Sequence, residues 1–274
     1  MTATENRAAA RTTDPTTGQA MTPARAMAPA RIMAPALAWT EVKLLFREPL
    51  VLVVTLGFPV LLMVLLLASF SEDDGLFAGL PPTEFYVTAY AGASVAAMGF
   101  MGLPTHLAGY RAGGVLRRFR AAGIPASSFL LAQTAVMAVL AAVGAAGMIG
   151  LAYAGFDLAA PESVPGVVAG FVAGIAAFTG IGALLGVLLP SARAAQGLGL
   201  LLFFGTFFVA GGGPPEDVLP AWLNDVAALT PTGLLIEAIR APWTTGDLNL
   251  AVVATLAGIA VAGFGLATAR LRST

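Results

Sequence analysis

The sequence predicts an all-α integral membrane protein with six transmembrane helices, an amphipathic interface helix before the first and a re-entrant external helical pair before the sixth. Of its 274 residues, 58% are hydrophobic and only 11% are charged, whereas soluble domains carry about 25% charged residues. The hydrophobic residues form runs long enough to cross a bilayer. Basic residues cluster in segments that six crossings place on one side. Cysteine is absent, which excludes disulfides and thiolate metal sites.

Residues 1–36 are rich in Ala, Thr, Pro and Arg, and three similar short segments begin at Met21, Met27 and Met33. Such a composition buries too little apolar surface to fold, so we expect a disordered tail. The tail lacks the continuous apolar core of a secretory signal peptide, so we expect it to stay in the cytoplasm. We assign residues 37–274 to one transmembrane domain.

Residues 37–48 predict a short amphipathic helix that ends before Pro49. Aromatic and aliphatic side chains share one arc at helical spacing, and basic side chains occupy the opposite arc. Such a helix lies in the membrane interface; the alternative is that it extends the first span. The residues assigned to the interface helix are Trp39, Lys43, Phe46 and Arg47.

Six apolar runs are long enough to be membrane spans, and we expect Pro59 to kink the first. They cover residues 50–70, 86–107, 128–153, 167–189, 197–210 and 248–268. Six spans place both termini on one side, together with every basic residue except Arg240. The positive-inside rule makes that side cytoplasmic, so we expect a multi-pass protein of the bacterial plasma membrane with both termini in the cytoplasm.

The moderately apolar segment 218–239 precedes the last span. Asn224, Asp225 and Glu237 would each be costly in a lipid-facing helix, and a full crossing would move the C-terminal arginines outside. We therefore expect two short helices that dip into the outer leaflet, with a break near Thr230 and Pro231. The residues that we single out in this external segment are Trp222, Pro231, Glu237 and Arg240.

Several kinds of catalytic site are excluded by residues that the chain lacks. The only lysine, Lys43, lies in no glycine-rich turn, so there is no Walker A loop. The only histidine, His106, excludes multi-histidine metal sites. No serine stands in a GxSxG context, and no predicted span carries an ionisable residue at its middle. We therefore expect energy to enter through a loop.

The loop at residues 111–125 holds the densest group of arginines next to the spans. At helical spacing its apolar side chains form one arc, and its arginines point elsewhere. A short helix of this kind can place its apolar face in a groove of a partner protein and its arginines on acidic residues at the rim. The alternative is an anchor on lipid headgroups. The residues assigned to the partner contact are Arg111, Val115, Leu116, Arg117, Arg118, Phe119 and Arg120.

Two segments carry a resemblance to a known family. Residues 114–133, GVLRRFRAAGIPASSFLLAQ, are similar to a loop of the form G-T-L-E-R-L-R-x-x-P. Residues 219–240, LPAWLNDVAALTPTGLLIEAIR, are similar to a region of the form P-x-W-L, a later proline and E-A-x-R. With the order of the elements, they resemble the membrane subunit of type-2 ABC exporters, the class that contains daunorubicin and antibiotic efflux permeases. The chain departs from that family in having no acidic residue in 112–120.

The resemblance implies two permease subunits, either two copies of this chain or this chain and a close paralogue, and two copies of a separate cytoplasmic ATP-binding subunit. That partner would bind ATP and magnesium, the basic loop would be the coupling helix, and the permease itself would bind no cofactor. No nucleic acid is implied. By analogy spans two and five line the substrate path, although packing between spans is the more common role of such apolar residues. The candidates for the path are Met98, Met101, Phe203, Phe204, Phe207 and Phe208, and we expect the phenylalanines to stack in pairs four residues apart.

The resemblance implies a permease that exports a hydrophobic or amphipathic substrate, such as a drug, an antibiotic or a lipid-like molecule. The alternatives are an ATP-independent channel or a secondary transporter, with a membrane-embedded lipid enzyme as a further class. A channel would conduct without ATP, and an enzyme would turn over as the isolated chain.

Overall fold

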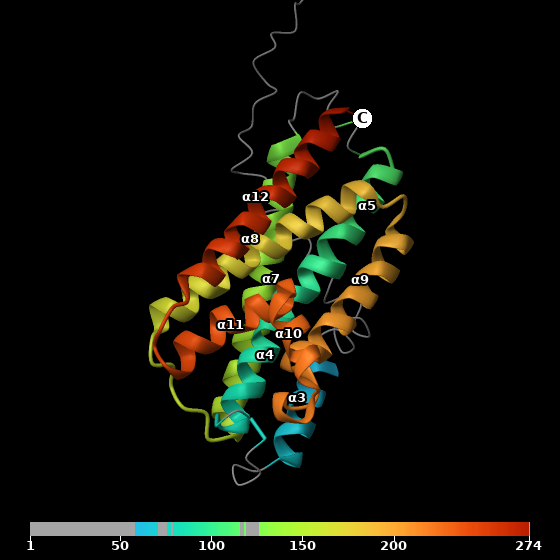
Figure 1. Ribbon diagram of the computed structural model, residues 1–274. Coiled ribbons are helices and arrows are strands. Elements are labelled where there is room, and N and C mark those ends of the chain that lie inside the picture. The colour runs from blue at the N-terminus through green and yellow to red at the C-terminus, as the bar shows by residue number, and fades with distance from the viewer. Residues whose placement is uncertain (1–57, 71–75, 78, 116–117, 119–125, 274) are drawn as a thin grey trace, which may run out of the picture.

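The structure is a computed structural model that describes residues 58–70, 76–77, 79–115, 118 and 126–273. The tail 1–36 and the interface helix 37–48 lie outside the described residues. Within the described residues every regular element is helical (Figure 1), so the all-α class is confirmed. In chain order these are α3 (Phe58–Ser69), α4 (Pro82–Ala97), η4 (Met98–Gly102), α5 (Leu103–Ala112), α7 (Ala126–Gly155), α8 (Val164–Leu188), α9 (Ala192–Phe207), η5 (Phe208–Gly212), η6 (Glu216–Val218), α10 (Ala221–Leu229), α11 (Pro231–Thr244) and α12 (Leu250–Ser273).

Five helical stretches of the described chain are long and apolar enough to cross a membrane. They are Pro82–Ala112, Leu130–Gly155, Val164–Leu188, Ala192–Gly212 and Leu250–Leu271, and they match predicted spans two to six. The helix α3 has 12 residues and lies inside predicted span one, whose first residues are outside the described part. A sixth crossing therefore stays a prediction.

The helices extend a few residues beyond most of the predicted spans, because capping groups rather than the ends of apolar runs set their limits. The hydroxyl oxygen of Ser163 accepts from the backbone N–H of Gly166 and starts α8, and Ser191 does the same for α9. At α11, Thr230 caps the N–H of Gly233. Two helices therefore meet at Thr230, where the break was predicted, although α11 continues past the predicted limit of residue 239 to Thr244.

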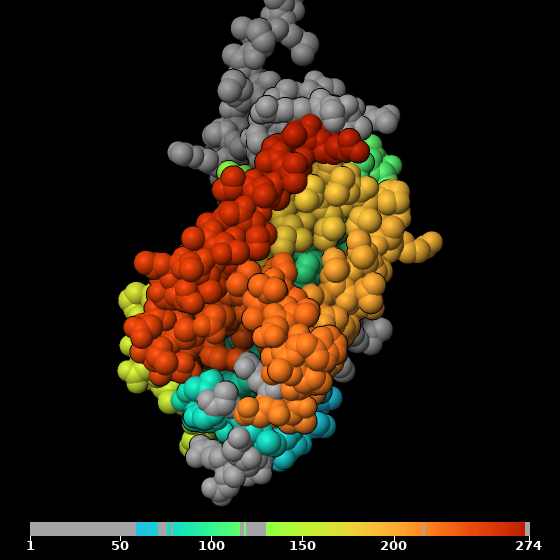
Figure 2. Space-filling model, in the orientation of Figure 1, coloured from blue at the N-terminus to red at the C-terminus, as the bar shows by residue number. Residues whose placement is uncertain are grey.

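The helix α4 lies at the centre of the bundle, and every residue from Phe85 to Ala96 is buried. It packs against α7 and α11, while α5, which continues it beyond η4, packs against α8 and α9. The most extensive contact joins α8 to α12. Figure 2 shows α12 in red and α9 in light orange on one face, with part of α8 between them.

Glycines of α8 set its distance from neighbouring helices, as the GxxxG spacing suggests. A Cβ at Gly170 would collide with the backbone of Ala238, and one at Gly174 would collide with Leu235, both in α11. A Cβ at Gly186 would collide with α5 in the same way. Consequently, α8 holds α11 on one stretch and α5 on another.

Candidate functional site

Arg111, in the last turn of α5, links two helices at the end of the bundle next to the basic loop. Its Nη1 donates to the carbonyl oxygens of Gly186 and Leu189 over 3.2 and 3.1 Å. These carbonyls belong to the C-terminal end of α8, where helix carbonyls lack partners within the helix and the helix dipole is negative. Thus Arg111 fixes the start of the basic loop to α8 of its own chain.

The chain leaves α5 through two glycines, and Gly114 has a φ of 68° that favours glycine. Beyond them, Val115 is half-buried and Arg118 is exposed. The Arg118 backbone N–H donates to the Gly114 carbonyl over 3.3 Å, which is a helical contact. The other residues assigned to the partner contact, Leu116, Arg117, Phe119 and Arg120, lie outside the described residues.

The four candidate phenylalanines of span five stack in pairs, as predicted. The rings of Phe203 and Phe207 are 5.3 Å apart and inclined by 13°. Those of Phe204 and Phe208 are 5.6 Å apart and inclined by 17°. The first pair is buried, and Phe207 also meets Tyr90 of α4 edge-on, with ring centres 5.1 Å apart. Phe208 is 36% exposed, so only the second pair reaches the surface of the protomer.

The candidate methionines of span two lie in η4, a π-helical segment between α4 and α5. Met98 and Met101 are both half-buried. Because η4 packs against α8 and α9, these flexible side chains occupy the junction of spans two, four and five. Adaptable apolar surface of this kind suits either packing or a variable ligand.

At the other end of α9, the segment η5 departs from helical geometry, and Gly211 has a φ of 105°. Two tyrosines of α4 donate to carbonyls at its C-terminal end. The Tyr86 hydroxyl donates to the Gly213 carbonyl and the Tyr90 hydroxyl to the Gly212 carbonyl, each over 3.1 Å. Such contacts hold the end of span five to the start of span two.

Arg240 of α11 is buried beside the same junction, with 8% of its surface exposed. Its Nε donates to the Thr88 hydroxyl over 3.3 Å and its Nη2 to the Phe85 carbonyl over 3.4 Å. The guanidinium carbon also lies 4.1 Å from the centre of the Phe85 ring, a cation–π contact. The sequence marked Arg240 as a residue of the external segment and as the basic residue on the external side; its burial against α4 was not predicted.

The external helices contribute two further contacts and two exposed residues. The Thr232 hydroxyl lies 2.7 Å from the Thr206 hydroxyl and joins α11 to α9. Pro231 begins α11, directly after the break. Trp222 of α10 is 66% exposed, and Glu237 of α11 is also exposed. The remaining candidates, Trp39, Lys43, Phe46 and Arg47, lie outside the described residues.

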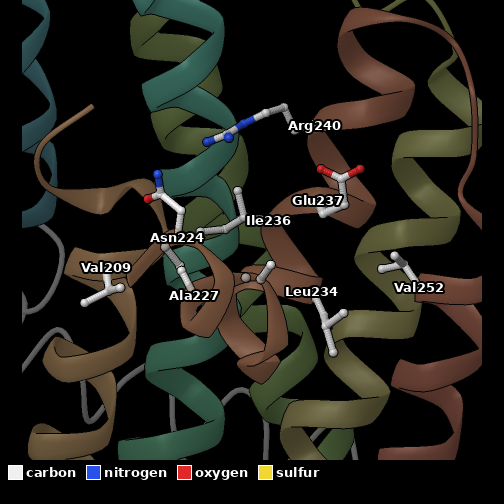
Figure 3. Close-up of a pocket in the computed structure, with 11 residues that line it drawn as sticks. Val209, Asn224, Ala227, Leu234, Ile236, Glu237, Arg240 and Val252 are labelled. Carbon is white, nitrogen blue, oxygen red and sulfur yellow. The ribbon is translucent and has the colours of Figure 1, made fainter. Parts of the chain in front are cut away.

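A pocket of about 270 Å³ opens between η5, α10, α11 and the first turn of α12 (Figure 3). Its polar lining residues are Asn224, Glu237 and Arg240. Its other walls are small or apolar: Val209, Ala210, Ala227, Ala228, Gly233, Leu234, Ile236 and Val252. The sequence marked Glu237 and Arg240 but did not predict that they line a cavity.

A family model described as ABC-2 type transporter matches residues 35–242. This range includes the basic loop, the two-helix external segment and the described helices up to α11. The chain belongs to the ABC-2 type transporter family. It is therefore a multi-pass membrane permease domain, which has no ATPase site of its own, and permeases of this family generally pair with ATP-binding subunits. A search of curated proteins found no match.

Proposed function

We propose that this ABC-2 permease is driven by a separate ATP-binding subunit and exports a hydrophobic or amphipathic substrate from the cytoplasm. The family match over residues 35–242 carries the proposal. It assigns the chain to transporters whose permease domain lacks an ATPase site, so we place the energy source in another subunit. Two copies of the ATP-binding subunit would act on two permeases, either two copies of this chain or this chain and a close paralogue.

The geometry at the basic loop supports this route for energy. A force on the loop reaches α5 directly, and Arg111 passes it to the C-terminal end of α8 through two hydrogen bonds. The helix α8 in turn contacts α11 and α12. Movement at residues 111–125 would therefore displace much of the bundle as connected rigid elements.

The external helices support the six-span topology. Pro242, near the end of α11, accepts from the Ser163 backbone N–H at the start of α8, over 3.0 Å. The helix α11 then runs antiparallel to α8 as far as Leu235, which faces Gly174. In chain order, α10 leads from α9 to the inner end of α11, and α11 then runs beside α8 back to the start of α8. This path fits a re-entrant pair on the non-cytoplasmic side.

Inside-out vesicles test the proposal. The permease is co-expressed with its ATP-binding subunit, and uptake of a fluorescent amphipathic dye into the vesicles is measured. We expect uptake that needs ATP and both subunits, and that stops when ADP replaces ATP. Equal flux without ATP or without the partner would favour a channel and contradict the proposal.

A further inference from the structure

The pocket beside Glu237 is slightly smaller than a typical small-molecule site and has a comparable mixed lining. Its volume of about 270 Å³ is close to the lower end of the usual range of about 300–1,000 Å³. Eight of its eleven lining residues are small or apolar, and they come from four different elements. Binding sites of this kind combine an apolar wall with a few polar groups that orient the ligand.

The position of Glu237 along the membrane normal follows from its level beside α8, a helix of 25 residues. A Cβ at Gly170 would meet Ala238, the neighbour of Glu237, so Glu237 lies near the level of Gly170. That level is six residues from Val164, or about 9 Å along the helix axis. By the proposed topology, Glu237 therefore lies close to the outer boundary of the membrane.

Polarity changes along the pocket. Leu234 and Gly233 precede Glu237 on α11, so they lie about 5 Å deeper in the bundle. Ala227 and Ala228 of α10 line the same cavity. The pocket thus has a carboxylate at its outer end and an apolar interior, which is the distribution that an amphipathic ligand would match.

The two charged residues of the lining are directed differently (Figure 3). The Arg240 guanidinium extends to α4, where it contacts Thr88 and Phe85. Among the described residues, no hydrogen bond or ion pair engages the Glu237 carboxylate. The Glu237 side chain is exposed, so its carboxylate is open to a ligand, and the apolar wall beside it strengthens its attraction to a positive charge relative to open water.

We propose that this pocket binds an amphipathic cation, with its apolar body between α10, α11 and α12 and its positive charge on the Glu237 carboxylate. The inference rests on the proposed function, for which it names the chemical class of substrate. Asn224 lines the same cavity and supplies a second polar group for the head of the ligand.

Equilibrium binding to the assembled complex in phosphatidylcholine nanodiscs tests the proposal. The probes are tetraphenylphosphonium and tetraphenylborate, which share a shape and carry opposite charges. We expect Glu237→Gln to weaken the displaceable binding of tetraphenylphosphonium about tenfold, the effect of about 1.4 kcal/mol, and not to weaken that of tetraphenylborate. Asn224→Asp should strengthen cation binding, and Ala228→Phe should weaken it by filling the cavity.

Asp225→Asn is the matched control, because Asp225 is an exposed acid of α10 outside the pocket lining. It should leave the affinity for the cation unchanged. Equal effects of Asp225→Asn and Glu237→Gln, or equal binding of the two probes by the wild type, would overturn the proposal. Release of the second permease by Glu237→Gln would also overturn it, because the carboxylate would then pair with a protein.

ATP-dependent dye uptake without Glu237-dependent binding contradicts this inference alone, whereas Glu237-dependent binding without ATP-dependent uptake contradicts the proposed function.

Discussion

The Nε of Arg240 donates to the hydroxyl of Thr88 over 3.3 Å and joins α11 to α4 across 152 positions of the chain. The same guanidinium lies over the Phe85 ring. One side chain therefore holds the external helices to the start of the central span. Because the guanidinium is buried, removing one partner would leave the other without a hydrogen bond and lower the stability of the fold.

Arg240→Ala should destabilise the permease by about 2–3 kcal/mol, since it removes two hydrogen bonds from a charged donor and the cation–π contact. Thr88→Val removes only one of these contacts and should cost about 1 kcal/mol. Thermal unfolding of the purified complex measures both. An Arg240→Ala variant as stable as the wild type would show that the buried contacts do not hold α11.

Gly170→Ala should weaken the packing of α8 on α11 by about 1–3 kcal/mol, because its Cβ would collide with the Ala238 backbone. Gly147→Ala in α7 is the matched control, since a Cβ at Gly147 meets no atom within 4 Å. That control should stabilise its helix by about 1 kcal/mol. Unfolding midpoints that shift in the same direction for both variants would rule out a close contact at Gly170.

The two stacked phenylalanine pairs of α9 should respond differently to truncation. Phe207→Ala opens a cavity against Tyr90 and should cost about 3–5 kcal/mol of stability. Phe208→Ala removes a ring at the surface of the protomer and should cost far less. If Phe208→Ala keeps both wild-type stability and wild-type dye uptake, Phe208 has no place in the substrate path.

The apolar spans and the stacked phenylalanines could be predicted because each depends on spacing along one helix. Phe203 and Phe207 are four residues apart, so any helix places them on one face. The family resemblance also drew attention to the basic loop and the external segment. Family membership is confirmed by the match over residues 35–242; the coupling role stays a prediction.

The contacts between helices could not be predicted from the sequence. Nothing near Arg240 in the chain indicates that its partners are Thr88 and Phe85, because pairing between distant helices depends on how they cross. The π-helical segments η4 and η5 also follow apolar runs without a distinct signal. The contact of Arg111 with a partner protein stays a prediction, whereas its hydrogen bonds to the carbonyls of Gly186 and Leu189 were not predicted.

Arg111→Ala should therefore uncouple transport without releasing the ATP-binding subunit. Loss of two hydrogen bonds to the α8 end, worth roughly 1–2 kcal/mol in the coupled state, should lower dye uptake per ATP hydrolysed about five- to thirtyfold. Arg193→Ala is the control, because Arg193 is an exposed arginine near the start of α9. Normal uptake per ATP with Arg111→Ala would show that α8 needs no such link.

The central claim is that a separate ATP-binding subunit drives this permease through residues 111–125. Co-purification of the tagged permease with that subunit tests it most directly, with membrane insertion checked in parallel. We predict that Arg118→Glu and Phe119→Ala each abolish co-purification and leave insertion intact, and that Arg193→Glu preserves both. Wild-type co-purification by both Arg118→Glu and Phe119→Ala would contradict the claim and leave the arginines as contacts with lipid headgroups.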